Sequence, residues 1–261
     1  MSRGARIHST AIVDPAAVLG AGVEVGPYAV VGSGVSIGYE TTIGTHAVLE
    51  GPTRIGRNNR IFPFASVGSA PQDLKYANEP TVLEIGDGNT IREYATLNRG
   101  TAGGGRVTRV GDANLVMAYA HVAHDCVIGN SVVMANAATL AGHVIVEDHA
   151  IVGGLVAIHQ HVRIGESAIL GGGTMVTLDV APFCMAVGDR AQLHGLNLVG
   201  LRRQGYGAEV IRRIRRAYRV LFQSGLSLAD ALDRLKDEAS ASPEVGRMVA
   251  FIRASKRGVC R

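Results

Sequence analysis

This 261-residue chain has nine histidines, and five of the six between positions 121 and 161 are predicted to share one face with an aspartate that directly follows one of them. They are His121, His124, His143, His159 and His161, with Asp125 after His124. An imidazole with an ordinary pKa of about 6.5 can take up a proton near neutral pH. A neighbouring carboxylate could orient it, and the backbone N–H of Gly142 could donate to a developing oxyanion. This group of residues therefore predicts a site of general base catalysis.

The spacing of nearby apolar residues predicts how these side chains are arranged. Val122, Leu140 and Ile158 follow one another at intervals of 18 residues. If each interval is one coil of a repetitive fold, their neighbours stack at the spacing of adjacent strands, about 4.8 Å. The predicted columns are His124, Gly142 and Gln160, and beside them Asp125, His143 and His161. Because adjacent residues on a regular strand point apart, contact between His124 and Asp125 requires a turn or a third partner.

A six-residue repeat is the element that must position these residues. Apolar residues recur every six positions from Ile7 to Val67, from Ile85 to Leu97 and from Val110 to Val176. All 26 positions are apolar, and glycine often follows them. This period fits neither the 3.6-residue period of a helix nor a simple hairpin repeat, and it indicates a short strand followed by a turn. Stacked units of this kind bury a continuous apolar column, so the sequence predicts a parallel β-helix.

Two interruptions of the repeat are candidate binding loops. The gap between positions 67 and 85 contains Gln72, Asp73 and Lys75, and the gap between positions 97 and 110 contains three consecutive glycines. Loops that leave a rigid scaffold commonly carry binding function.

The end of the chain is predicted to be helical. After Gly205, apolar residues recur at three and four positions, as on one face of an amphipathic helix. Ser227 and the pair Ser242-Pro243 mark the starts of two further helices. We therefore expect a catalytic β-helix domain over residues 1–190 and a C-terminal α-helical domain over residues 191–261.

Charge and cysteine content limit the class of protein. From residue 200 onward there are 14 Lys and Arg against 6 Asp and Glu, whereas the rest of the chain has 12 against 16. The basic tail predicts an acidic partner or a phosphate ligand. The three cysteines have no disulfide or zinc-ribbon spacing, and no stretch has the length of a membrane span or the character of a signal peptide. We expect a cytoplasmic protein without membrane insertion or nucleic-acid binding.

The repeat resembles that of the hexapeptide-repeat transferases. In that family, three hexads form one triangular coil of a left-handed parallel β-helix, and the chains assemble as homotrimers. The resemblance therefore implies a mainly β fold, a left-handed parallel β-helix of hexapeptide repeats, and three subunits. The left hand follows from the resemblance alone, since the general rule for crossovers favours the right.

Longer motifs resemble the UDP-N-acetylglucosamine acyltransferase family, which begins lipid A synthesis. The match covers essentially the whole chain. It rests on His121-Val122-Ala123-His124-Asp125-Cys126, Ala141-Gly142-His143, Ile158-His159-Gln160, Gln72-Asp73-Leu74-Lys75-Tyr76, Ile91-Arg92-Glu93, Arg99-Gly100-Thr101 and Gly195-Leu196-Asn197.

The resemblance implies transfer of a 3-hydroxyacyl chain from acyl carrier protein to the 3-hydroxyl of UDP-N-acetylglucosamine, without metal or cofactor. It implies His124 as general base, Asp125 as its support and the Gly142 amide as oxyanion donor. The implied substrate-binding residues are Gln72, Asp73, Lys75, His121 and His143, in a cleft shared by adjacent subunits, and His159, Gln160, Asn197 and Arg203. Ile169 and Gly172 are implied to limit the length of the acyl chain, whose preferred length stays open.

Three positions depart from the family pattern, namely Asn98, Val199 and Gln204. They leave open how strongly the nucleotide is bound and whether the acceptor sugar carries a 3-hydroxyl or a 3-amino group. Other readings are a trimeric carbonic anhydrase, with zinc on His121, His124 and His143, and a repeat scaffold without catalysis. The N-acyltransferase that acts later in the pathway is a further relative, although its hexads follow a separate N-terminal domain.

Overall fold

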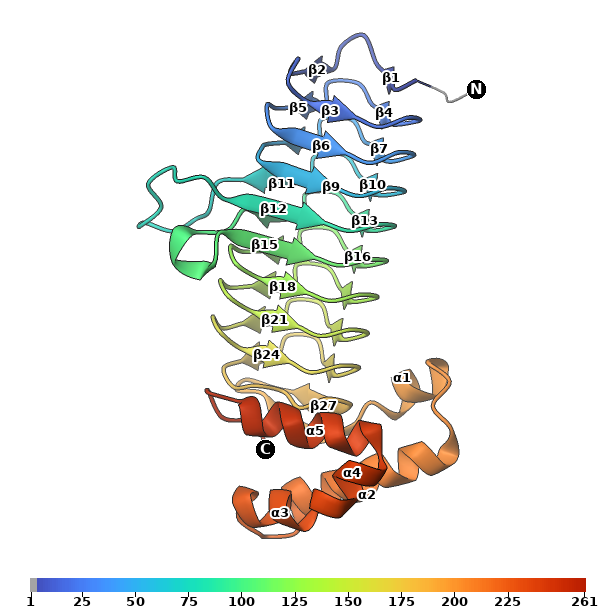
Figure 1. Cartoon of the computed structure of the whole chain (residues 1–261), viewed down its shortest axis with the longest axis vertical. Helices are drawn as coiled ribbons and strands as arrows, with labels where there is room; N and C mark the ends of the chain where they lie inside the picture. The colour runs from blue at the N-terminus through green and yellow to red at the C-terminus, as the bar shows by residue number, and fades with distance from the viewer. Residues whose placement is uncertain (1–3) are drawn as a thin grey trace.

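The computed structural model describes residues 4–261, so the first three residues of the predicted β-helix domain lie outside the described part. The chain forms a long triangular prism of three sheets, and a group of helices covers its C-terminal end (Figure 1). Each coil contributes one strand to each sheet in turn, and neighbouring strands of the coils are parallel.

We call the three sheets A, B and C. Sheet A contains β1 (Arg6–Ile7), β4 (Glu24–Val25), β7 (Thr42–Ile43), β10 (Arg60–Ile61), β13 (Thr90–Ile91), β16 (Leu115–Val116), β19 (Val133–Met134), β22 (Ile151–Val152), β25 (Ile169–Leu170), β27 (Cys184–Val187) and β28 (Gln192–Leu196). Sheet B contains β2 (Ile12–Val13), β5 (Val30–Val31), β8 (Val48–Leu49), β11 (Ser66–Ser69), β14 (Thr96–Asn98), β17 (His121–Val122), β20 (Thr139–Leu140), β23 (Ala157–Ile158) and β26 (Met175–Val176). Sheet C contains β3 (Val18–Leu19), β6 (Val35–Ile37), β9 (Thr53–Ile55), β12 (Val82–Ile85), β15 (Val107–Val110), β18 (Val127–Ile128), β21 (Ile145–Val146) and β24 (Arg163–Ile164).

The β-helix is left-handed, as the resemblance implied. In Figure 1 the strands of sheet C run from left to right at the front, and the chain then passes behind and descends to the next coil. Seen from the N-terminal end, the chain therefore turns counter-clockwise as it moves away.

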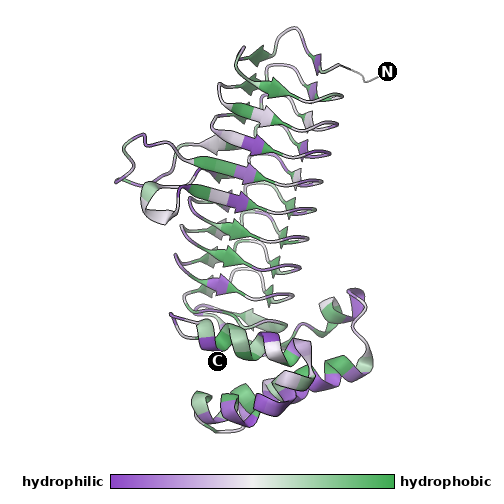
Figure 2. Ribbon diagram, in the orientation of Figure 1, coloured by the Kyte–Doolittle hydropathy of each residue, from purple (hydrophilic) through white to green (hydrophobic). Residues whose placement is uncertain are grey.

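The core consists of the predicted apolar column. Each of the strands β1–β26 contains one of the 26 repeat positions, and Figure 2 shows the resulting hydrophobic strands along the prism. All of these side chains are buried except Ile7, Val13 and Leu19, which lie in the first coil where no preceding coil covers them. The six-residue pattern is confirmed, because from Val25 onward all of its positions are buried in the interior of the prism.

The two interruptions leave the prism at the same corner. The first loop (residues 70–81) joins β11 to β12, and the second loop (residues 99–106), which includes the short 3-10 helix η1 (Ala102–Gly104), joins β14 to β15. Both therefore connect sheet B to sheet C in successive coils, and they project together from one edge in Figure 1.

Five α-helices follow the last strand. They are α1 (Leu198–Arg203), α2 (Ala208–Gln223), α3 (Leu228–Arg234), α4 (Lys236–Ala241) and α5 (Pro243–Ala254). The predicted starts of α3 and α5 are confirmed, with Ser227 and Ser242 at the N-caps, whereas α1 begins before Gly205 and was missed, as was α4. No helix within residues 4–261 is long and apolar enough to span a bilayer.

Candidate active site

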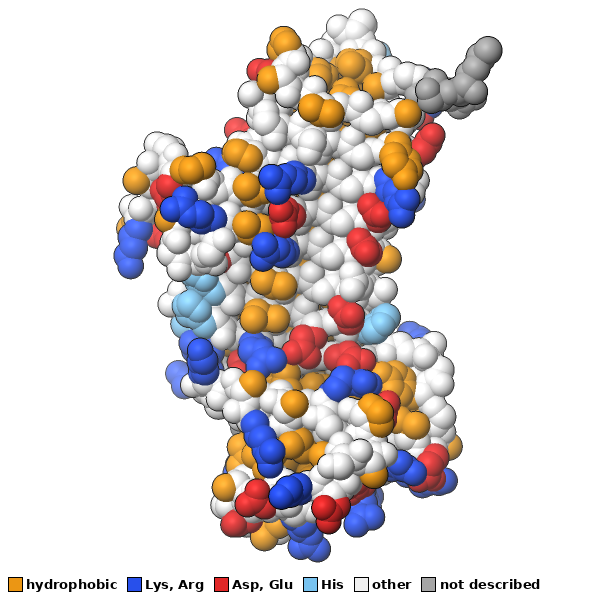
Figure 3. All heavy atoms as spheres, in the orientation of Figure 1, with side chains coloured by type: hydrophobic (Ala, Val, Ile, Leu, Met, Phe, Trp, Pro, Cys, Tyr) orange, Lys and Arg blue, Asp and Glu red, His pale blue; other side chains and the backbone are white. Residues whose placement is uncertain are grey.

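The turns that connect sheet B to sheet C form a continuous edge, which we call the B–C corner. The two loops, the turn at His124 and Asp125, the turn at Gly142 and His143, and the turn at Gln160 and His161 follow one another along it. In Figure 3 histidine side chains appear at this edge, below the projecting loops and above a group of basic side chains.

The turn after β17 brings His124 and Asp125 into contact. Asp125 has a φ of 59°, so the backbone does not continue as a strand and the two side chains point to the same place. His124 Nδ1 lies 2.8 Å from Asp125 Oδ2, and the carboxylate side chain is 0% exposed. Since an ionised carboxylate only accepts hydrogen bonds, Nδ1 donates and Nε2 is left with a lone pair. His124 is therefore arranged as a base.

Gly142 lies against the ring of this histidine, as the column of residues 124, 142 and 160 predicted. A Cβ atom on Gly142 would be 2.5 Å from Cε1 and 2.7 Å from Nε2 of His124, so only glycine leaves room for the imidazole. Within the described part of the chain, the Gly142 N–H meets no protein acceptor, whereas the following N–H, from His143, donates to His124 O at 3.0 Å. The Gly142 N–H is thus available to a bound group.

Three further histidines surround the pair. His143 stacks on His161 with ring centroids 4.4 Å apart and meets the ring of His124 edge-on at 5.1 Å, which matches the second predicted column. Burial lowers the pKa of His143, an effect that Asp125 opposes and that His161 and His124 reinforce, and burial with the charge of His124 also lowers the pKa of His121. His143 and His121 are therefore biased toward their neutral forms.

Asp73, in the first loop, acts on this group of histidines, whereas its neighbours in the loop are exposed to solvent. The charge of Asp73 acts on His143 in the direction that raises its pKa. Gln72 and Lys75 are exposed, and the backbone N–H of Lys75 donates to Asp73 Oδ1 at 3.0 Å.

Four predicted substrate residues are not brought to the B–C corner of this chain. Asn197 is buried at the N-cap of α1, where its side chain accepts from Gly200 N and donates to Ser167 O, each at 3.0 Å. Arg203 is exposed on the same helix. Ile169 lies on sheet A, and Gly172 lies in the turn between sheets A and B. Within a single chain these residues therefore lie at α1, on sheet A and in the turn between sheets A and B, and not at the B–C corner.

A basic cavity adjoins the histidines, and the sequence did not predict it. It has a volume of about 450 Å³ and is lined by His143, Ile145, His161, Arg163, Asp179, Ala254, Lys256 and Arg257. Arg257 donates to Thr177 O at 3.1 Å and lies 3.3 Å from His159 Nδ1. The charge of the tail indicated a phosphate ligand, but no periodic signal placed the C-terminal residues against this corner.

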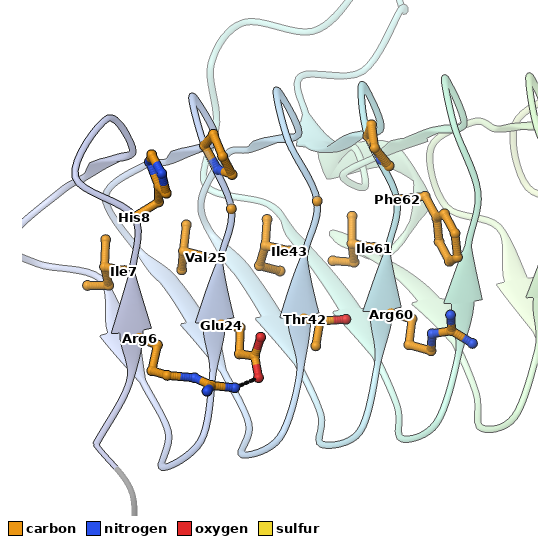
Figure 4. Close-up of a pocket in the computed structure, with 14 residues that line it drawn as sticks. Arg6, Ile7, His8, Glu24, Val25, Thr42, Ile43, Arg60, Ile61 and Phe62 are labelled. Carbon is orange, nitrogen blue, oxygen red and sulfur yellow. Dashed lines mark hydrogen bonds and ion pairs between the residues drawn. The ribbon is translucent and has the colours of Figure 1, made fainter.

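A second cavity, of about 520 Å³, lies on the N-terminal half of sheet A (Figure 4). His8 and Phe62 lie at its ends, Gly26 and Gly44 are among the residues that line it, and Arg6 pairs with Glu24 on neighbouring strands. It contains no base with an orienting carboxylate, so the B–C corner is the candidate active site.

The three departures from the family pattern have separate surroundings. Asn98 is buried, and its amide donates to Ser69 O at 3.3 Å and Ala70 O at 2.9 Å, at the start of the first loop. Gln204 accepts from Ser167 Oγ at 2.6 Å. Val199 is exposed on α1.

The possible metal ligands within residues 4–261 do not form the three-histidine set considered above. Ligand atoms of His124, Asp125 and His143 lie within 4.8 Å of one another, whereas His121 is outside this group and its Nδ1 lies 2.7 Å from Thr96 Oγ1.

Comparisons with known proteins identify relatives over nearly the full chain. The family model "Udp N-acetylglucosamine O-acyltransferase; Domain 2" matches residues 179–260. The acyl-(acyl-carrier-protein)–UDP-N-acetylglucosamine O-acyltransferase of Alkalilimnicola ehrlichii is 56% identical over 98% of this chain and 99% of its own length, and that of Myxococcus xanthus is 53% identical over 98% and 100%. Among solved structures, the UDP-N-acetylglucosamine acyltransferase of Francisella novicida has a TM-score of 0.95 at 37% identity, covering 98% of this chain and 94% of its own. That of Campylobacter jejuni has a TM-score of 0.94 at 41% identity, covering 98% and 99%. The chain belongs to the family of UDP-N-acetylglucosamine O-acyltransferases.

Proposed function

We propose that this chain transfers a 3-hydroxyacyl group from acyl carrier protein to the 3-hydroxyl of UDP-N-acetylglucosamine, the first step of lipid A synthesis. The observation that carries the proposal is the contact of a buried Asp125 carboxylate with His124, beside the free N–H of Gly142. The names of the relatives supply the two substrates.

The reaction follows from the three groups. His124 Nε2 takes the proton of the sugar hydroxyl as its oxygen attacks the thioester carbonyl. Asp125 stabilises the resulting imidazolium, and the Gly142 N–H donates to the oxyanion of the tetrahedral intermediate. When the intermediate collapses, the C–S bond breaks and His124 returns the proton to the thiolate of the carrier. Burial raises the pKa of the neighbouring Cys126 thiol to about 12, which argues against a covalent acyl-cysteine.

The substrate groups are assigned to residues near this pair. We propose that Gln72, Asp73, Lys75, His121 and His143 bind the sugar and acyl groups. His159, Gln160, Asn197 and Arg203 are proposed to bind sugar, uridine and phosphates. The basic cavity supports a phosphate-bearing substrate, because Arg163, Lys256 and Arg257 outweigh Asp179 in its lining.

An apolar strip on sheet A supports the assignment of the acyl chain. Leu115, Val133, Ile151 and Ile169 lie opposite one another on successive strands, whereas the earlier strands place Arg60 and Thr90 at this position. Ile169 lies toward the end of the strip, and Gly172 lies in a nearby turn, so both are proposed to limit chain length.

We also propose a homotrimer with sites between subunits. The histidine group lies at the B–C corner and the acyl strip lies on sheet A, which does not adjoin that corner, so a second copy is needed to bring them together. A stack of five exposed rings supports such a contact, since large exposed apolar patches commonly mark interfaces. The rings are Tyr28, His46, Phe64, Tyr94 and Tyr119, with successive centroids 4.9–5.1 Å apart.

Carrier binding and domain organisation are part of the same proposal. Exposed arginines on α2, among them Arg212, Arg216 and Arg219, would bind an acidic carrier protein. We propose residues 1–190 as the catalytic domain and residues 191–261 as the helical domain. Three free buried cysteines are compatible with a reducing cytoplasm.

The test is acyl transfer from 3-hydroxyacyl carrier proteins of several chain lengths to UDP-N-acetylglucosamine, with the wild type beside His124→Ala. We expect transfer by the wild type and a loss of about 10²- to 10⁴-fold in the variant, the usual range for a general base. Light scattering should give about 82 kDa for both, three chains of 27.3 kDa. Transfer only to the 3-amino sugar nucleotide would reassign the acceptor, and no transfer to either would contradict the proposal.

A further inference from the structure

The second loop contacts the carboxylate of Asp125. Thr101 donates two hydrogen bonds to Asp125, from its backbone N–H to Oδ1 at 2.9 Å and from its hydroxyl to Oδ2 at 2.6 Å. Both groups are buried. The Oδ2 atom that accepts from Thr101 also accepts from His124. The loop therefore holds the same oxygen that orients the base.

The carboxylate has a second imidazole within reach. His143 Nδ1 lies 4.0 Å from Asp125 Oδ2, against 2.8 Å for His124 Nδ1. A modest rotation of the carboxylate would exchange one imidazole for the other. Because Thr101 binds both oxygens, such a rotation would break both of its hydrogen bonds. Thr101 thus selects which histidine the carboxylate supports.

Two glycines let the second loop enclose Asp125. A Cβ atom on Gly104 would lie 2.0 Å from the Asp125 carboxyl carbon, and one on Gly100 would lie 2.8 Å from Oδ1 as well as 2.4 Å from Val107 N. By contrast, a Cβ atom on Gly103 would meet nothing within 4 Å. The close approach is confined to the residues that face the carboxylate.

Hydrogen bonds join the second loop to the first loop. Glu79 accepts from the backbone N–H of Ala77, in its own loop, at 2.8 Å and from that of Ala102, next to Thr101, at 3.1 Å. Arg99 donates to Gly68 O and, at 3.3 Å, to Tyr76 Oη. These contacts tie the loop that carries Gln72, Asp73 and Lys75 to the residue that holds Asp125.

We propose that Thr101 is a positioning residue, which fixes the Asp125 carboxylate on His124 rather than on His143, and that Glu79 fastens the loop that carries it. The proposal rests on the proposed function for its kinetic consequences, but the position of the carboxylate is independent of any substrate. Thr101 touches neither sugar nor acyl chain in this assignment, so its loss should lower kcat and leave both KM values unchanged.

The test compares Thr101→Val, which keeps the shape but removes the hydroxyl, with Thr101→Ser, which restores it. We expect kcat to fall about 10- to 100-fold in the valine variant, the range for losing a hydrogen bond to a charged group. The serine variant should recover to within about threefold of the wild type. Gly104→Ala should behave like the valine variant, and Gly103→Ala like the wild type.

Crystal structures of Thr101→Val and the wild type provide the readout that needs no activity. In the valine variant we expect Oδ2 to leave His124 and approach His143. A carboxylate that stays in place together with an unchanged kcat would overturn the proposal, as would a raised KM with unchanged kcat. If the wild type transfers no acyl group, the proposed function is wrong. The position of the Asp125 carboxylate in the two crystal structures then decides by itself whether Thr101 is a positioning residue.

Discussion

Replacement of Gly142 by alanine tests the geometry of the base directly. The added Cβ would lie 2.5 Å from Cε1 and 2.7 Å from Nε2 of His124, where ordinary van der Waals contacts are 3.4–4 Å. The imidazole must therefore move by about 1 Å, a displacement that can cost about 100-fold in rate. Because Gly142 does not have a positive φ, alanine adds no backbone strain, and the N–H proposed to bind the oxyanion is retained.

The assay is kcat for acyl transfer at saturating substrates, with thermal unfolding and light scattering as measures of integrity. We expect a fall of about 100-fold in kcat with an intact assembly. Gly103→Ala, which adds the same methyl group where nothing lies within 4 Å, should keep the wild-type rate. A wild-type kcat in Gly142→Ala, or an equal loss in Gly103→Ala, would refute the placement of Gly142 against the base.

Three further outcomes follow from other parts of the molecule. Lys256→Ala should raise the KM of a phosphate-bearing substrate by about tenfold, because Lys256 lines the basic cavity. The control Lys236→Ala, on α4, should leave this KM unchanged. Steady-state kinetics in which the concentration of each substrate is varied in turn will show which substrate binds in the basic cavity. Gly172→Met should shift the preference toward shorter acyl chains, as measured by competition between carrier-bound chains of different length, and an unchanged preference would remove Gly172 from the acyl site. Burial lowers the pKa of His121 and His143 in the folded state, so the unfolded chain binds more protons as the pH falls below about 6.5. Stability should therefore decrease from pH 7 to pH 5, with a shallower slope in the double variant His121→Gln/His143→Gln, as measured by thermal unfolding at each pH.

The repeat could be predicted from the sequence because its contacts recur at a fixed separation. A separation of 18 residues predicts that Gly142 lies beside His124 and that His143 lies beside Asp125, as the structure shows. The bonds of Thr101 to Asp125 span 24 residues and that of Glu79 to Ala102 spans 23, because the loops insert residues into the coils. No period relates such pairs, so their contacts depend on loop conformation and could not be predicted. The position of Asn197 could not be predicted from the sequence either, since it depends on how α1 packs on the prism.

The scaffold itself explains how adjacent residues come to act together. Nineteen non-glycine residues within 4–261 have a positive φ, most of them at turns of the coils, so the value of 59° at Asp125 belongs to the architecture and is not local strain acquired for catalysis. This turn aims Asp125 at the side chain before it, whereas a strand would separate the two. Most other turns of the prism share the conformation but lack the pair of residues and the covering loop. The turn at Asp125 differs from these other turns because the second loop, an insertion in the preceding coil, covers it. Thr101 of this loop donates two hydrogen bonds to Asp125. Catalysis at this corner thus depends on a regular turn for the contact between base and carboxylate, and on an irregular loop for keeping that contact.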